Sequence, residues 1–200
     1  MFKIDKKTQN LSINKYYKRE FGEIHTPYSL IESMFSLFPE KIFKNPNLKW
    51  LDPGTGRGFF SIFLYNKLYE SLFDSIKDPL KRKEHILTNM LYMVEINPEN
   101  ISILKTIFGN NSNIIQCDYT KYKFDFTFDV IIGNPPYNSS GLIKVPTNNV
   151  NNKKSDGKTI WYSFVKQSIY NLKNDGLLSF IIPSIWMKPC RNDMYDYMMQ

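Results

Sequence analysis

The stretch DVIIGNPPY, residues 129–137, is a short apolar run that ends in an amide, two prolines and an aromatic ring. An apolar run of this length, bounded by turn residues, predicts a buried strand that carries a site at its carboxyl end. Each proline fixes its own φ and holds the residue before it extended. Asn134 and Pro135 are therefore expected to be rigid and to lie outside any helix.

The two prolines also decide which polar groups this corner offers. Because proline has no N–H, the corner presents the side-chain oxygen of Asn134 and the carbonyl of Pro135 as acceptors, with few competing donors. Tyr137 adds a flat apolar face. The corner suits a planar ligand that bears an NH₂ group, and the same residues also suit a rigid turn without a ligand.

Upstream, residues 51–60, LDPGTGRGFF, join an apolar strand to the start of a helix through a glycine-rich turn. The three glycines permit unusual backbone dihedrals and close approach by a ligand. The Lys-Ser/Thr ending of a phosphate loop is missing, and a dinucleotide fingerprint spaces its glycines differently. We interpret this turn as a ligand-binding loop, because three glycines destabilise a turn that one glycine could make.

Two further apolar runs carry an acidic residue near their end. Residues 91–96 contain Glu95 as the last residue but one, and residues 113–119 contain Asp118 in the same place. In nucleotide-binding α/β folds, an acid at the end of the second strand accepts hydrogen bonds from ribose hydroxyls, so Glu95 is the candidate for that role. Asp118 fits a cap or turn residue nearly as well as a ligand-binding residue.

Strands and helices alternate five times along the chain, which predicts an α/β fold with a parallel sheet and helices on both faces. Thr26 and Pro27 are expected to cap and begin the first helix, and Asn97 to cap a helix that ends at Gly109. Residues 174–176 are expected to form a turn before a fifth strand.

The C-terminal third of the chain and two polar segments complete the expected secondary structure. We expect a helix over residues 160–172, the fifth strand over 177–184 and the start of another helix near 191. The charged segment 74–89 is expected to be a surface excursion, and the polar segment 138–158 a mobile loop beside the site.

The composition bounds the class of protein. Contents of 42% hydrophobic and 16% aromatic residues predict a packed domain. No apolar run approaches the roughly 18 residues of a membrane span, and the first residues lack the apolar core of a secretory signal, so a cytoplasmic location without a membrane partner is expected. Two cysteines and two histidines are too few for a four-cysteine zinc site, so no metal is expected. The net charge of +7 favours a polyanionic partner.

Together these motifs resemble the amino-methyltransferases that use S-adenosylmethionine, in particular the gamma-type N(6)-adenine DNA methyltransferases of restriction-modification systems. The NPPY corner matches the family motif Asn/Asp-Pro-Pro-Tyr/Phe, and DPGTGRGFF, residues 52–60, matches the cofactor loop Asp-Pro-x-x-Gly-x-Gly-x-Phe. The segment GEIHTP, residues 22–27, lies ahead of the glycine loop, as in the gamma arrangement. The resemblance covers roughly residues 21–187.

The resemblance implies a Rossmann-like methyltransferase fold with a mainly parallel sheet. Residues 1–21 would form a basic N-terminal arm. Residues 22–200 would form an incomplete catalytic domain that stops after the fifth strand and lacks a target-recognition domain. The DNA target sequence would then be recognised by a missing C-terminal domain or by a separate specificity subunit.

The resemblance also assigns roles to individual residues. It implies S-adenosyl-L-methionine as the cofactor, and it makes Asn134, Pro135 and Tyr137 the catalytic residues. The cofactor-binding residues that it implies are Thr26, Pro27, Asp52, Pro53, Gly54, Gly56, Glu95, Ile96, Asp118, Tyr119 and Asn134. In this assignment Ile96 and Tyr119 flank the adenine ring of the cofactor, and Asp118 accepts its amino group.

The expected activity is transfer of a methyl group from the cofactor to the exocyclic amino group of an adenine flipped out of DNA. A cytosine amino group would fit the same corner. A protein glutamine amide or RNA as the methyl acceptor, and a non-catalytic nucleic-acid-binding fragment, remain as alternatives at this point.

Overall fold

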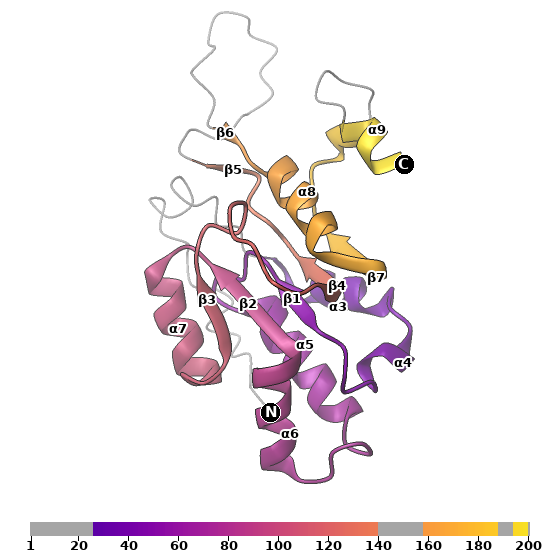
Figure 1. Cartoon of the computed structure of the whole chain (residues 1–200), viewed down its shortest axis with the longest axis vertical. Helices are drawn as coiled ribbons and strands as arrows, with labels where there is room; N and C mark the ends of the chain where they lie inside the picture. Colours follow the sequence, from indigo (N-terminus) through magenta and orange to yellow (C-terminus); the bar gives the residue numbers. More distant parts are fainter. Residues whose placement is uncertain (1–25, 140–157, 188–193, 200) are drawn as a thin grey trace, which may run out of the picture.

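The computed structural model describes residues 26–139, 158–187 and 194–199 (Figure 1). The expected N-terminal arm, residues 22–25 of the GEIHTP segment and most of the expected loop at 138–158 lie outside the described residues. The described part contains a main sheet of five strands and a small sheet of two.

All neighbouring strands of the main sheet run parallel, in the order β3-β2-β1-β4-β7. The strands are β1 Trp50–Asp52, β2 Leu91–Glu95, β3 Asn113–Gln116, β4 Phe128–Gly133 and β7 Leu172–Phe180. The small antiparallel sheet pairs β5 Asn138–Ser139 with β6 Lys158–Thr159. The five parallel strands expected from the sequence are confirmed.

The helices follow the expected alternation, with additional short ones. They are α3 Tyr28–Ser36, α4 Glu40–Phe43, α5 Phe59–Ser71, α6 Pro79–His85, the π-helix η1 Ile86–Met90, α7 Pro98–Phe108, α8 Trp161–Asn171, the 3-10 helix η2 Ser184–Met187 and α9 Met194–Met199. The helices expected near residues 160–172 and 191–200 are thus present as α8 and α9.

Alternation along the central strands sends apolar side chains to both faces of the sheet. Trp50, Met93 and Val130 pack into one core cluster with residues of α3, α5 and η1. Their neighbours Leu51, Val94 and Ile131 lie in a second cluster with Phe164 of α8. The prediction of helices on both faces is confirmed, because each cluster joins the sheet to at least one helix.

The helix signals around Pro98 act as expected. The Asn97 side chain accepts a hydrogen bond from the Glu99 N–H at 3.0 Å, Pro98 is the first residue of α7, and the helix ends at Gly109 with φ +95°. Residues 74–89 were expected to be a surface excursion, and this prediction is wrong for the second half. Ile86, Leu87 and Met90 are buried in the first cluster, and the charged residues precede them in α6.

Strand β7 begins earlier than expected because residues 174–176, which were predicted to form a turn, lie within the strand. Phe128 pairs with Leu172 but Val130 pairs with Leu177, so three extra residues bulge out of β7. Asp175 lies in the bulge with φ +64°, a conformation that Asp tolerates better than most residues. The expected turn is therefore a bulge within the strand.

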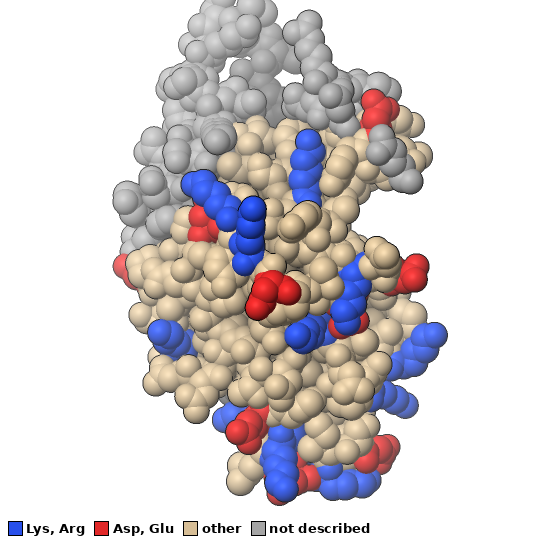
Figure 2. Space-filling model, viewed as in Figure 1, with Lys and Arg blue, Asp and Glu red and all other residues tan. Residues whose placement is uncertain are grey.

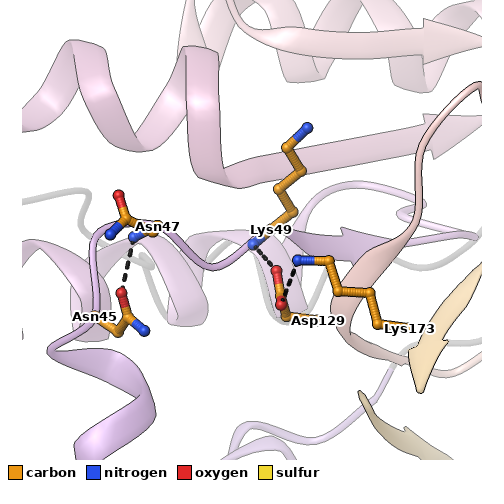
Figure 3. A network of polar contacts seen from close by, with 5 residues as sticks. All are labelled: Asn45, Asn47, Lys49, Asp129 and Lys173. Carbon is orange, nitrogen blue, oxygen red and sulfur yellow. Dashed lines mark hydrogen bonds and ion pairs between the residues drawn. The ribbon is translucent and has the colours of Figure 1, made fainter. Parts of the chain in front are cut away.

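A polar network holds this bulge to the amino ends of β4 and β1 (Figure 3). The two carboxylate oxygens of Asp129 accept hydrogen bonds from the Lys49 backbone N–H and from Lys173 Nζ, each at 2.7 Å. A charged acceptor bonded to a backbone donor contributes more than an exposed ion pair. Asp129 thus joins three strand segments that are far apart in the chain.

We expect Asp129→Ala to lower the free energy of unfolding by about 1–3 kcal/mol, since the Lys49 N–H loses its acceptor. Urea denaturation measures this change. Asp74→Ala is the matched control, because it removes the exposed ion pair of Asp74 with Lys77 and should change stability little. Equal effects of the two substitutions would show that the network is unimportant.

Candidate functional site

The motif residues lie at the carboxyl edge of the three central strands. The glycine loop leaves β1, Glu95 ends β2, and Asn134 directly follows β4. Because β1 lies between β2 and β4, Glu95 and Asn134 stand on either side of the glycine loop. The strand order reverses at β1 and β4, and open α/β sheets bind ligands at such a switch point.

Hydrogen bonds to β2 shape the glycine loop. The Thr55 N–H donates to the Val94 carbonyl at 3.0 Å, and the Gly56 N–H donates to Glu95 Oε2 at 2.7 Å. Gly56 has φ +56°, and a Cβ placed there would meet no atom within 4 Å. The loop is therefore held on one side and has room for a ligand at Gly56.

The glycine loop and the NPPY corner are in contact. A Cβ at Gly54 would lie 3.3 Å from Pro136 Cδ and 3.7 Å from Pro135 Cα. A side chain at 54 would crowd Pro136 by a few tenths of an ångström, so glycine favours the close packing of the two segments. Two motifs about 80 residues apart thus form one surface.

Asp52, at the end of β1, is buried with one oxygen unpaired. Its Oδ2 accepts a hydrogen bond from the Ser61 hydroxyl at 2.8 Å, and its Oδ1 has no hydrogen-bond partner among the described residues. Burial, with a smaller contribution from Glu95, raises the pKa of Asp52 to about 7 against the hydrogen bond from Ser61. A buried, unpaired carboxylate oxygen is costly, so a cationic group of a ligand would stabilise it.

Ser61 was not among the residues expected at the site. It lies in the first turn of α5, fully buried, and its hydroxyl faces Asp52. A polar residue in an otherwise apolar helix start, nine positions after the strand acid, is the signal that points to this contact.

Asn134 combines one bonded and one unbonded amide atom. Its Nδ2 donates to the Thr26 hydroxyl at 3.0 Å, while Oδ1 is buried and has no partner among the described residues. Thr26 was expected to cap a helix, and this prediction is wrong. Pro27 occupies the cap position of α3 with no side-chain cap bond, and the Thr26 hydroxyl contacts Asn134 instead.

Glu95 holds the backbone at the end of β2. Its Oε1 accepts hydrogen bonds from the N–H groups of Ile96 and Asn97 at 2.8 and 2.7 Å, in addition to the Gly56 bond to Oε2. The Ile96 side chain beside it is 46% exposed. The carboxylate thereby sets the position of the glycine loop, and Ile96 offers an apolar surface at the same edge.

Asp118 forms a local turn. Its Oδ1 accepts hydrogen bonds from the N–H and hydroxyl of Thr120, and its Oδ2 lies 2.9 Å from Lys121 Nζ. Partial burial alone would raise the pKa of Asp118, but the bonds from Thr120 and Lys121 outweigh it and lower the pKa. These contacts are all local, so they fit the turn role that the sequence allowed for Asp118.

The Tyr119 side chain is buried in the core. Its ring is buried in the second core cluster, 5.4 Å from the Phe164 ring, and its hydroxyl bonds the side chains of Ser168 and Asn171. Burial raises the pKa of Tyr119 to about 12. The ring fills the space between the sheet and α8, so it is not available to flank a ligand.

Tyr137 is half-buried beside α8. Its carbonyl accepts a hydrogen bond from the Ile160 N–H at 3.0 Å, and its ring packs against the cluster of Trp161, Val165 and Met194. Burial raises the pKa of the Tyr137 hydroxyl, so the side chain is neutral at ordinary pH. The ring is anchored on one side and partly open on the other.

Comparison with known proteins agrees with this arrangement. Residues 61–200 match the model of the Eco57I restriction-modification methylase family. The chain belongs to the Eco57I restriction-modification methylase family. The expected relationship to restriction-modification methylases is thereby confirmed.

Individual relatives of this Eco57I-family chain are distant and longer. An adenine-specific methylase of Mycoplasma pneumoniae, itself uncharacterized, is 26% identical and aligns with 85% of this chain and 57% of its own length. The type II methyltransferase M.AccI of Acinetobacter calcoaceticus is 25% identical, over 86% of this chain and 30% of the relative. The chain therefore spans between about a third and about half of these proteins.

Among solved structures, a Listeria monocytogenes protein assigned to the class I S-adenosylmethionine-dependent methyltransferases superposes with a TM-score of 0.59. The identity is 17%, and the match covers 96% of this chain and 55% of that protein. At this identity the likeness concerns the fold. The expected Rossmann-like methyltransferase fold of this Eco57I-family chain is confirmed.

The surface carries charges of both signs. Figure 2 shows Lys and Arg intermingled with Asp and Glu over the viewed face. None of the helices in the described ranges is long and apolar enough to cross a membrane. Within the same ranges, no group of three or more His, Cys, Asp or Glu side chains is arranged to hold a metal ion.

Proposed function

We propose that this chain is the catalytic part of a DNA methyltransferase that acts on the exocyclic amino group of a flipped-out adenine and uses S-adenosyl-L-methionine. The observation that carries the proposal is the buried Oδ1 of Asn134, an acceptor without a partner among the described residues. It lies at the strand end beside the glycine loop, where an NH₂ group would satisfy it. The family and the names of the relatives support adenine in DNA as the target.

The residues around the glycine loop fit the proposed cofactor. Asp52 Oδ1 would pair with the ammonium of the amino-acid part, and the open side of Gly56 leaves room for the backbone to approach it. Glu95 stands where an acid accepts hydrogen bonds from ribose hydroxyls, and Ile96 offers an apolar face for the adenine ring. When bound, S-adenosyl-L-methionine supplies a methyl group on a sulfonium that is already activated for displacement.

Other residues near the carboxyl edge of the sheet are also proposed to contact the cofactor. Pro27 and Pro53 lie in the segments that border the same edge, and Asp118 keeps an exposed part of its carboxylate that can accept from an amino group. Thr26 is not among the proposed cofactor contacts, because its hydroxyl bonds Asn134. Tyr119 is not among the proposed cofactor-binding residues, because its ring lies in the core.

Asn134 and Pro135 would make the amino nitrogen a better nucleophile. The lone pair of an adenine amino group is delocalised into the ring, so the nitrogen is a poor nucleophile. Hydrogen bonds from its two N–H groups to Asn134 Oδ1 and to the Pro135 carbonyl would favour a tetrahedral nitrogen and stabilise the charge that develops on it. No side-chain base is required for this step.

The target base has to leave the duplex, at a cost of a few kcal/mol. The Tyr137 ring, held by α8 and partly open, would receive it by stacking. A partner subunit or a further domain would supply recognition of the DNA sequence, since the relatives extend well beyond the part that this chain matches.

We expect Tyr137→Ala to weaken DNA capture by about 1–3 kcal/mol, because it removes the stacking surface. The KM for unmethylated DNA should rise while the Kd for the cofactor stays the same. Tyr137→Phe keeps the ring and is the matched control. An unchanged KM for the alanine variant would contradict this role of Tyr137.

A methyl-acceptor assay tests the proposed function. The chain is incubated with S-adenosyl-L-methionine labelled in the methyl group and with equal masses of duplex DNA, RNA or bulk protein. We expect label in DNA. Label in RNA or in protein alone would overturn the proposal in favour of one of the alternatives.

A further inference from the structure

We infer that Thr26 is a positioning residue that orients the side-chain amide of Asn134. The inference deepens the proposed function and rests on it. The Asn134 Nδ2 donates to the Thr26 hydroxyl oxygen at 3.0 Å, whereas Oδ1 of the same amide has no partner among the described residues. The contact therefore occupies the donating end of the amide and leaves the accepting end available.

The orientation matters because a carboxamide has two unlike ends. One end is a carbonyl that only accepts, and the other is an NH₂ that only donates. An amide turned by 180° would present its NH₂ to the NH₂ of the target base, and neither group could accept from the other. With the Thr26 hydroxyl accepting from Nδ2 and a target NH₂ donating to Oδ1, both ends of the amide are satisfied at once, which the flipped amide cannot achieve against an NH₂ group.

Thr26 is itself held in place by the start of α3. The residue before a proline is kept extended, and Thr26 precedes Pro27 and is 5% exposed. The Pro27 carbonyl accepts hydrogen bonds from the N–H groups of Leu30 and Ile31 at 3.0 and 3.2 Å, which begins the helix. The backbone position of Thr26 is thus fixed by the start of α3.

Helix α3 in turn packs on the helix that leaves the glycine loop. Ile31 is fully buried, and the Phe35 ring stacks on the Phe63 ring of α5 with 4.7 Å between centroids. The Tyr28 ring contacts the same Phe63 ring at 5.3 Å. Thr26 therefore connects the Asn134 amide to the element that carries the proposed cofactor loop.

Two substitutions at position 26 test the inference. Thr26→Val keeps the shape and removes the hydroxyl, and Thr26→Ser keeps the hydroxyl. We expect Thr26→Val to lower kcat by up to about 100-fold through misplacement of the amide, with little change in the Kd for S-adenosyl-L-methionine. Thr26→Ser should recover most of kcat. A loss of cofactor affinity that accounts for the whole effect, or an unchanged kcat, would overturn the inference.

A symmetric side chain at position 134 gives a sharper test. Aspartate has two equivalent carboxylate oxygens, so it has no wrong orientation. In the Asn134→Asp background, Thr26→Val should lower the single-turnover rate much less than it does with Asn134. An effect of equal size in both backgrounds would show that Thr26 acts in another way.

Nuclear magnetic resonance provides a readout that needs no activity. In ¹⁵N-labelled chain, the side-chain NH₂ signals of Asn134 are those that disappear in Asn134→Asp. We expect Thr26→Val to shift these signals and Thr26→Ser to leave them close to their original positions. Signals that do not move in Thr26→Val would overturn the inference, whereas a chain that fails to methylate DNA but shows the shift would overturn only the proposed function.

Discussion

Asn134→Ala is expected to lower kcat for DNA methylation by about 100- to 1,000-fold, the loss typical of removing one preorganised polar group that stabilises developing charge. The Kd for S-adenosyl-L-methionine should change little, because the glycine loop, Asp52 and Glu95 are intact. The substitution removes the buried Oδ1 acceptor and the hydrogen bond to Thr26 together. Incorporation of labelled methyl groups measures kcat, and calorimetry measures Kd.

The matched control for this prediction is Asn45→Ala. Asn45 is exposed and lies before β1, at the opposite edge of the sheet, where its side-chain oxygen accepts a hydrogen bond from the Asn47 N–H (Figure 3). This variant should methylate at the normal rate. An Asn134→Ala variant as active as Asn45→Ala would show that the NPPY corner is a structural turn.

The affinity for S-adenosyl-L-methionine is expected to fall as the pH drops below about 7. Burial raises the pKa of Asp52 to about 7, and the ionised form is the one that pairs with an ammonium group. Below this pKa the carboxyl has to release a proton before it binds, which weakens Kd by about tenfold for each pH unit. Above pH 7 this dependence should disappear.

Asp52→Asn provides the comparison. The variant should bind the cofactor more weakly at pH 8, and its Kd should not change between pH 5.5 and pH 8. Calorimetry in buffers of different ionisation enthalpy also counts the protons released by the unsubstituted chain. A flat pH profile for the unsubstituted chain would exclude Asp52 as the ammonium partner.

The same raised pKa affects the stability of the cofactor-free protein. Between the unfolded pKa of 3.8 and the folded pKa of about 7, the folded state holds a proton that the unfolded state has lost. The contribution of Asp52 to the free energy of unfolding therefore falls as the pH rises through this window and is constant above it. Asp52→Asn should remove this fall, and urea denaturation at several pH values measures it.

Features that depend on neighbouring residues in the chain were predictable. Apolar runs bounded by glycine, proline and asparagine marked the strands, and Asn97 with Pro98 marked the start of α7. Because parallel strands share one carboxyl edge, the shared placement of Gly56, Glu95 and Asn134 also followed from the sequence.

Features that depend on tertiary contacts were not predictable. The Thr26 hydroxyl matches a helix cap in every local respect, and its contact to Asn134 spans 108 positions. Tyr119 follows a strand end as a ligand-binding ring would, but the second face of the sheet required an apolar side chain to pack under α8. Segment 74–89 was predicted to lie on the surface because of the charged residues of α6, but the apolar residues that follow them pack into the core.

The crystal structure of the chain with sinefungin, an analogue that carries an amine near the position of the transferable methyl group, tests the central claim most directly. We predict that its amino-acid end pairs with Asp52, and that its amine lies beside the glycine loop and faces Asn134 Oδ1 across a gap wide enough for a base. A structure in which the analogue binds elsewhere, or in which Asn134 Oδ1 points away from it, would contradict the claim.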